Sequence, residues 1–248
     1  MHELSVVSWV VAALSAMMIG VSKTGLPGVG ILAITWMATV IPARASTGLI
    51  LPMLIAGDVI AVALYRRHAV WSHLLKFLPC AAAGVLIGWK ALAHVNDRQL
   101  RPIIGGIILA MLALNYWRQR LSGDDAPIPR GWWFAVAMGL FAGITTMMAN
   151  AAGPIMIIYL LAMRLPKVEF IGTSAWYFLL VNLFKVPLSA NLGLITLESL
   201  RFNLMLLPAL AVGGLLGVRL ARRIPEKAFN AVVEVLAVIG AAMLLWPA

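Results

Sequence analysis

The fold of this chain is decided by residues 21–30, Val-Ser-Lys-Thr-Gly-Leu-Pro-Gly-Val-Gly, which separate two apolar runs. Three glycines and one proline in this stretch disfavour a continuous helix, because glycine costs backbone entropy and proline removes a hydrogen-bond donor. The same stretch places Lys23 where the surrounding hydropathy predicts lipid. Irregular backbone at membrane depth is tolerated only where protein or water supplies its hydrogen bonds. The alternative is a short loop outside the membrane, with Lys23 at its surface.

The composition is that of a polytopic helical membrane protein. The chain is 62% hydrophobic and 11% charged, with a mean hydropathy of +0.97. The net charge of +10 is attributed to loop Lys and Arg residues rather than to nucleic-acid binding, because no nucleic-acid motif occurs. Cys80 is the only cysteine, which excludes an intrachain disulfide and a cysteine-based metal site. We expect no cofactor.

The apolar runs follow one another along the whole chain. They cover residues 4–21, 28–41, 46–64, 72–93, 100–117, 132–147, 153–165, 170–190, 200–221 and 228–246. Most are long enough to cross about 30 Å of hydrocarbon as helices. The runs 28–41 and 153–165 would reach only about 20 Å. Each of these short runs follows a broken stretch, and the two occupy the same place in each half of the chain.

The two halves of the chain repeat one pattern. The matched positions are Gly20 and Gly143, Gly30 and Gly153, Gly48 and Gly172, Asp58 and Asn182, Pro79 and Pro208, Gly84 and Gly213, Gly88 and Gly217, and Trp117 and Trp246. We therefore predict a first repeat over 1–120, a linker over 121–130 and a second repeat over 131–248. Each repeat has five runs, an odd number, so the second copy is inverted in the membrane. The predicted fold is all-α, with broken or re-entrant helices meeting at the midplane.

The Lys and Arg residues assign a side to each loop. Under this topology one side holds Arg66, Arg67, Arg118, Arg120, Arg130, Arg164, Lys167, Arg219, Arg222, Arg223 and Lys227. The other side holds only Arg44, Arg98, Arg101 and Arg201. The positive-inside rule makes the first side cytoplasmic and places both termini outside an inner membrane. Residues 1–3 carry no positive charge, so we expect no cleavable signal peptide.

Two glycine pairs predict close helix packing. Gly84 and Gly88 are separated by three residues, and so are Gly213 and Gly217 on the matching run of the second half. Small residues at this spacing let two helix backbones approach closely. We therefore assign both pairs to helix packing rather than to ligand binding.

The counterpart of the opening stretch is residues 143–154, Gly-Ile-Thr-Thr-Met-Met-Ala-Asn-Ala-Ala-Gly-Pro. It too precedes a short run, and Pro154 suits the first turn of a helix. Two short helices would then begin inside the protein, and helix N-termini bind anions. The predicted anion site comprises Lys23, Thr24, Gly25, Pro27, Gly28, Gly30, Thr145, Thr146, Asn150, Gly153, Pro154 and Lys185. The alternative for the polar residues of the second stretch is interhelical hydrogen bonding.

Asp58 and Lys185 lie within matching apolar runs, where charges are costly and are functional or paired. In one interpretation Asp58 carries a proton while Lys185 or Lys23 contacts the anion. In the other, Asp58 and Lys185 form a structural ion pair between the halves. Asn182 matches Asp58 and can donate a hydrogen bond but cannot titrate. Asp58 and Asn182 are therefore the predicted coupling residues.

The stretches Gly20–Gly30 (GVSKTGLPGVG) and Gly143–Pro154, placed in two five-run halves, resemble those of the TauE/SafE family of sulfite exporters. That family is also grouped with toluene-sulfonate uptake permeases, and the resemblance covers nearly the whole chain. It implies transport of small sulfur-containing anions such as sulfite, sulfonates, sulfoacetate or thiosulfate.

Together these patterns predict a secondary transporter embedded in the lipid bilayer, with possible proton coupling. No nucleotide-binding motif is present, so the driving force would come from ion gradients or from the anion's own gradient. An anion channel for small oxyanions is the alternative. We do not expect an enzyme, because no His-Glu-x-x-His motif, no Gly-x-Ser-x-Gly motif and no paired catalytic carboxylates occur.

Overall fold

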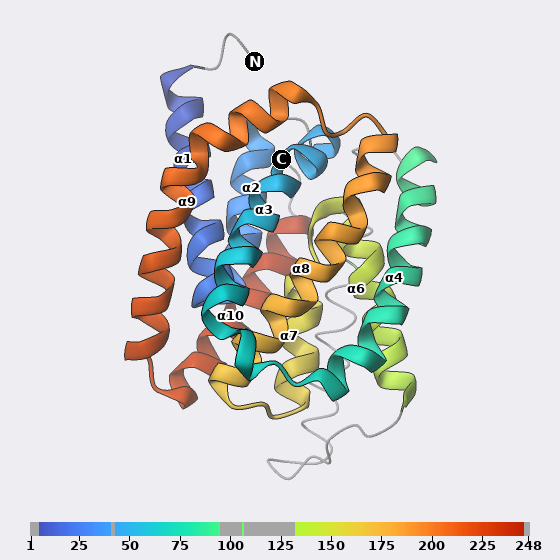
Figure 1. Ribbon diagram of the computed structural model, residues 1–248, viewed down its shortest axis with the longest axis vertical. Helices are drawn as coiled ribbons and strands as arrows, with labels where there is room; N and C mark the ends of the chain where they lie inside the picture. The colour runs from blue at the N-terminus through green and yellow to red at the C-terminus, as the bar shows by residue number, and fades with distance from the viewer. Residues whose placement is uncertain (1–4, 41–42, 95–105, 107–131, 246–248) are drawn as a thin grey trace.

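The structure, a computed structural model, describes residues 5–40, 43–94, 106 and 132–245 (Figure 1). Every regular element in this part of the chain is a helix. The elements are α1 (Val6–Thr24), α2 (Val29–Val40), α3 (Ala43–Tyr65), the short 3-10 helix η1 (Arg66–His68), α4 (Trp71–His94), α6 (Trp132–Ala149), α7 (Gly153–Ala162), α8 (Lys167–Asn191), α9 (Leu197–Arg223) and α10 (Glu226–Leu245). These helices confirm the predicted apolar runs. The run 100–117, apart from residue 106, and the linker 121–130 lie outside the described residues.

Six helices of the described part are long and apolar enough to cross a bilayer. They lie at Val6–Thr24, Thr47–His68, Trp71–Leu92, Trp132–Ala149, Lys167–Asn191 and Leu197–Arg223. In contrast, α2 has 12 residues and α7 has 10, and their lengths of about 18 and about 15 Å fall short of the hydrocarbon thickness. The predicted shortness of these two helices is confirmed. Neither helix can cross the hydrocarbon alone, so each has at least one end inside the bundle.

The first break, between α1 and α2, arises from its glycines and proline. The amide groups of Gly25 and Leu26 both donate to the carbonyl of Val21, at 2.9 and 3.0 Å, so the regular bonding of α1 ends there. Pro27 has no amide to continue it, and Gly28 has a φ of 108°, a conformation that side chains oppose. The sequence prediction that this stretch interrupts the helix is confirmed.

The second break, between α6 and α7, arises at an asparagine rather than at glycines. Asn150 adopts a φ of 54° directly after α6, as asparagine does in left-handed helix caps. The amide of Asn150 donates to the Thr146 carbonyl at 3.0 Å, and that of Ala151 donates to the Thr145 carbonyl at 3.2 Å. Pro154 then lies in the first turn of α7, as predicted.

The predicted glycine pairs lie at close helix contacts. A Cβ on Gly213 would overlap the backbone of Met17 in α1, and one on Gly20 would overlap Leu210 and Gly214 in α9. Figure 1 shows α1 and α9 side by side along one edge of the bundle. Since no side chain fits between these backbones, the assignment of Gly213 and Gly217 to packing is confirmed.

The same arrangement occurs at the opposite edge, where α4 packs along α6 (Figure 1). A Cβ on Gly84 would overlap the carbonyl of Leu140, and a Cβ on Gly143 would overlap Ala81. Gly88 also approaches α6, with the Ile144 carbonyl 2.9 Å from its built Cβ. The packing assignment is therefore confirmed for the first half as well.

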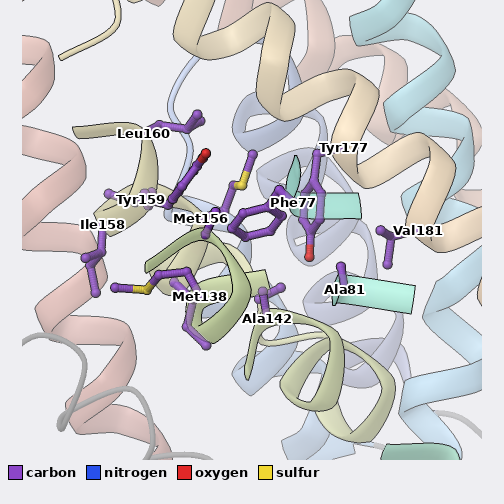
Figure 2. Close-up of a cluster of buried hydrophobic side chains, with 14 of the residues drawn as sticks. Phe77, Ala81, Met138, Ala142, Met156, Ile158, Tyr159, Leu160, Tyr177 and Val181 are labelled. Atoms are coloured by element: carbon purple, nitrogen blue, oxygen red, sulfur yellow. The ribbon is translucent and has the colours of Figure 1, made fainter. Parts of the chain in front are cut away.

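Helix α7 is enclosed by protein on all sides. Eight of its ten residues are buried, as expected for a helix that is apolar all round. Figure 2 shows Phe77 of α4 between Tyr159 of α7 and Tyr177 of α8. The ring centroids of Phe77 lie 4.6 Å from Tyr159 and 5.1 Å from Tyr177. These aromatic contacts fix α7 against two long helices and so set the position of its N-terminus.

Helices α3 and α8 pack against each other between the two edge pairs. Figure 1 shows them running in opposite vertical directions, as do α1 and α6, and α4 and α9. Large apolar side chains remain exposed on outer faces of the bundle, among them Leu75, Leu86, Leu204, Met205 and Leu215. An apolar exterior of this kind suits contact with lipid.

Candidate functional site

Both helix breaks open onto one cavity of about 50 Å³, large enough for several water molecules or a small oxyanion. From the first break and the adjacent helices it is lined by Ser22, Lys23, Pro27, Gly28, Gly30, Ile34 and Leu54. From the second half it is lined by Thr146, Asn150, Gly153, Ile157, Ser174, Ala175, Phe178 and Asn182. Seven of the residues that the sequence singled out in two distant stretches therefore meet at this cavity: Lys23, Pro27, Gly28, Gly30, Thr146, Asn150 and Gly153.

Lys23 forms an ion pair with Asp58 at this cavity. The distance from Lys23 Nζ to Asp58 Oδ1 is 2.7 Å, and only 10% of the Lys23 side chain is exposed, while Asp58 is fully buried. The ammonium also lies 4.0 Å from the ring centroid of Phe178, a cation–π contact. Lys23 is thus held inside the protein by a carboxylate and an aromatic ring rather than lying in a surface loop.

Asn182 connects this ion pair to a second lysine. Its Nδ2 donates to Asp58 Oδ2 at 2.7 Å, and its Oδ1 lies 3.4 Å from Lys185 Nζ. Lys185 Nζ donates at 2.6 Å to Asn150 Oδ1 and at 3.2 Å to Thr146 Oγ1. The carboxylate therefore pairs with Lys23, and Lys185 is solvated by neutral oxygens. The hypothesis of a direct Asp58–Lys185 pair does not match this arrangement.

The first turns of both short helices border the cavity. Gly30 is the second residue of α2, and Gly153 is the first residue of α7. The first amide groups of a helix have no partner within it and carry partial positive charge. A Cβ built on Gly153 meets no atom within 4 Å, so the cavity has open space at this N-terminus. Two helix N-termini and one ammonium together favour a bound anion.

Comparison with protein families matches the model described as "Sulfite exporter TauE/SafE" to residues 10–244. The match spans nearly the whole chain. This chain belongs to the TauE/SafE family. Neither a curated protein nor a solved structure matches it. At the level of the family, it is a multi-pass membrane transporter of sulfur-containing anions.

In this TauE/SafE chain, two of the residues that the sequence assigned to the anion site from the first stretch, Thr24 and Gly25, do not line the cavity. Thr24 is buried, and its hydroxyl donates to the carbonyls of Gly20 at 3.1 Å and of Gly214 at 2.7 Å. Gly25 packs so closely against Gly217 that a Cβ would overlap its carbonyl. Both residues therefore hold α1 against α9 in this conformation.

Three of the residues that the sequence assigned to the anion site from the second half, Thr145, Pro154 and Lys185, also do not line the cavity. The Thr145 hydroxyl donates within its own helix, to the carbonyls of Phe141 at 2.9 Å and of Ala142 at 3.2 Å. Pro154 is buried in the first turn of α7. Lys185 stands behind Thr146, Asn150 and Asn182, all of which line the cavity.

Sequence reasoning missed seven residues of the cavity wall, of which Ser22, Ser174 and Phe178 are polar or aromatic. Ser22 adjoins Lys23 and lies 2.9 Å, through its Oγ, from a Cβ built on Gly30. Ser174 and Phe178 precede Asn182 on α8 by eight and four residues. Positions four apart share a helix face, so this spacing is the signal that would have included them.

Proposed function

We propose that this chain is a secondary transporter that moves a small sulfur-containing anion, such as sulfite, a sulfonate, sulfoacetate or thiosulfate, across a bacterial inner membrane. The observation that carries the proposal is the cavity at which Lys23 meets the first turns of α2 and α7. A buried ammonium and two helix N-termini favour an oxyanion over a neutral or cationic ligand. The driving force comes from an ion gradient or from the anion's own gradient.

An inverted repeat accounts for the way in which the helices pair. The first helix of each half packs along the fourth helix of the other half, in α1 with α9 and in α6 with α4. The third helices, α3 and α8, pack against each other and run in opposite directions (Figure 1). A two-fold relation between halves of opposite topology requires this exchange of partners. The proposed topology keeps both termini outside.

Alternating access is supported by a second cavity, which a hydrogen bond of Tyr65 connects to the neighbour of Lys23. This cavity of about 250 Å³ is lined by ends of α3, α8 and α9, including Tyr65, Lys167 and Arg222. The Tyr65 hydroxyl donates at 3.0 Å to the carbonyl of Thr24, the neighbour of Lys23. We propose that this contact closes the anion cavity toward the basic end of the bundle, and that it opens during transport.

The test uses purified full-length protein and proteoliposomes. We expect sulfite, thiosulfate, sulfoacetate or a sulfonate to raise the melting temperature with increasing concentration, since a ligand stabilises the state that binds it. Reconstituted protein should then show saturable counterflow of that anion. Large conductance without saturation would favour the channel alternative, and the absence of both binding and flux for every anion would overturn the proposal. Lys23→Met should weaken anion binding, because it removes the ammonium that lines the cavity. The matched control is Lys76→Met, at an exposed lysine on α4, which should leave anion binding unchanged.

A further inference from the structure

The charges around the anion cavity do not cancel. Lys23 and Asp58 neutralise each other across 2.7 Å, and the second carboxylate oxygen accepts from Asn182. Both residues are at least nine-tenths buried, so water contributes little to their solvation. This pair therefore contributes no net charge to its surroundings.

Lys185 adds a positive charge that no carboxylate of the described residues contacts. Its side chain is fully buried, and its Nζ lies within 3.4 Å of oxygens from Thr146, Asn150 and Asn182, all of them uncharged. The Asn182 amide lies between Lys185 and Asp58, donating to one and accepting from the other. Asp58 is thus engaged elsewhere, and among the described residues at the cavity one positive charge is left over.

This surplus charge is next to the cavity. All three side chains that solvate Lys185 also line the cavity wall, so a single layer of polar groups separates the ammonium from a bound ligand. An isolated buried charge is costly, and an anion at this distance offsets that cost. A monoanion balances the site, whereas a dianion of the same size leaves one buried negative charge.

We propose that this charge count sets the valence of the ligand: the cavity selects a monoanion, such as a sulfonate or hydrogen sulfite, over a dianion, such as sulfate or thiosulfate. This rests on the proposed function, since it assumes that the cavity is the anion site. Lys185 acts as a positioning residue that supplies charge through Thr146, Asn150 and Asn182 without touching the ligand. Asp58 sets the net charge at the cavity because its carboxylate neutralises the ammonium of Lys23.

Methanesulfonate and sulfate test the rule, because both are tetrahedral and of similar size but differ by one charge. Their dissociation constants are measured on purified full-length protein at near-neutral pH by calorimetry and by thermal stabilisation. The parent should bind methanesulfonate at least about tenfold more tightly than sulfate, since one buried charge is worth more than one decade of affinity. Lys185→Arg keeps the charge and should keep this preference.

Variants that alter the count should shift the preference predictably. Lys185→Gln lowers the net charge of the buried groups at the cavity by one and should weaken methanesulfonate binding by about tenfold or more. Asp58→Asn raises this net charge by one and should shift the relative affinity toward sulfate. The double variant Asp58→Asn with Lys185→Gln restores the parental count and should restore the parental preference. The double variant also tests the valence rule if either single variant fails to fold, because its net charge equals that of the parent.

The possible outcomes separate the valence rule from the transport function. Tighter binding of sulfate than of methanesulfonate by the parent overturns the rule while leaving the anion site in place. A monoanion preference that is unchanged in Lys185→Gln and Asp58→Asn also overturns it, because the preference then arises elsewhere. If methanesulfonate, sulfite, sulfoacetate and thiosulfate all fail to bind the parent and none is transported, the proposed function falls and the rule falls with it.

Discussion

The side-chain amide of Asn182 donates to the carboxylate of Asp58 over 2.7 Å, and the sequence pattern predicts that the two residues occupy matching positions in the two halves of the chain. One half therefore supplies an acceptor that can titrate, and the other supplies an amide that cannot. Because both are buried, this contact joins α3 to α8 at the centre of the bundle. Among the described residues of this core, Asp58 supplies the carboxylate, and Lys23 pairs with it.

The first prediction concerns the ion pair between Lys23 and Asp58. Lys23→Met leaves a fully buried carboxylate without its cation, and we expect it to destabilise the protein by about 3–5 kcal/mol. Adding Asp58→Asn removes the stranded charge and should recover most of that loss. Melting temperatures of the parent, both single variants and the double variant measure the coupling. An unchanged melting temperature in Lys23→Met would contradict a buried ion pair. It would favour the alternative that Lys23 lies in a loop outside the membrane.

The second prediction separates the cavity from the helix packing by using two glycines. A methyl group at Gly153 meets no atom within 4 Å, so Gly153→Ala should fold normally while narrowing the space in front of the α7 N-terminus. We expect weaker anion binding, by about tenfold, with a melting temperature close to that of the parent.

Gly143→Ala is the matched control for that substitution. Its methyl group would overlap the Ala81 carbonyl and force α4 away from α6, so it should lower stability by about 1–3 kcal/mol. The two effects are read from thermal unfolding and from anion titration of the same preparations. If Gly153→Ala destabilises the protein as much as Gly143→Ala does, the space at the α7 N-terminus is not open.

The sequence determined most of the helices because hydropathy and helix breakers act locally. The structure confirms the long apolar runs of the described residues as helices. It also shows that α1 ends at the glycines and proline of residues 21–30, as predicted. The break at Asn150 was also expected from sequence, although its left-handed φ of 54° could be read only from the backbone. Glycine spacing predicted packing surfaces because only the absence of a side chain permits such contacts.

The partners of polar side chains were harder to predict, because they depend on helix rotation and on three-dimensional distance. Thr24 adjoins Lys23 in sequence, but its hydroxyl turns away to the Gly214 carbonyl of α9. Asp58 lies between two buried lysines, and periodicity alone did not decide which of them would reach it. Phe178 was missed because an aromatic residue in an apolar run resembles core until a cation is found above its ring.

The third prediction concerns the side of the membrane on which the linker lies. The excess of Lys and Arg predicts that the linker 121–130 lies in the cytoplasm. A single cysteine, Ser122→Cys in a Cys80→Ser background, should react with an impermeant thiol reagent only after the membrane is opened. A second single cysteine near the N-terminus, at Ser5, should react in intact cells and serves as the positive control. Labelling of residue 122 from outside intact cells would contradict the proposed orientation of both repeats.

The last prediction asks whether Asp58 couples transport to protons. Asp58 lies seven residues before the end of α3, roughly 10 Å of helix from the basic end of the bundle, so a proton has only a short distance to travel. If the ion pair with Lys23 opens during the cycle, the carboxylate can take up a proton in one state and release it in the other. Asp58→Asn should then abolish accumulation of anion driven by a pH gradient in proteoliposomes, while anion exchange without a gradient continues. Glu169→Gln removes a carboxylate that does not line the cavity and should leave accumulation intact. Gradient-driven accumulation at the parental level in Asp58→Asn would end the coupling role and leave Asp58 with a purely structural one, as the partner of Lys23 and Asn182.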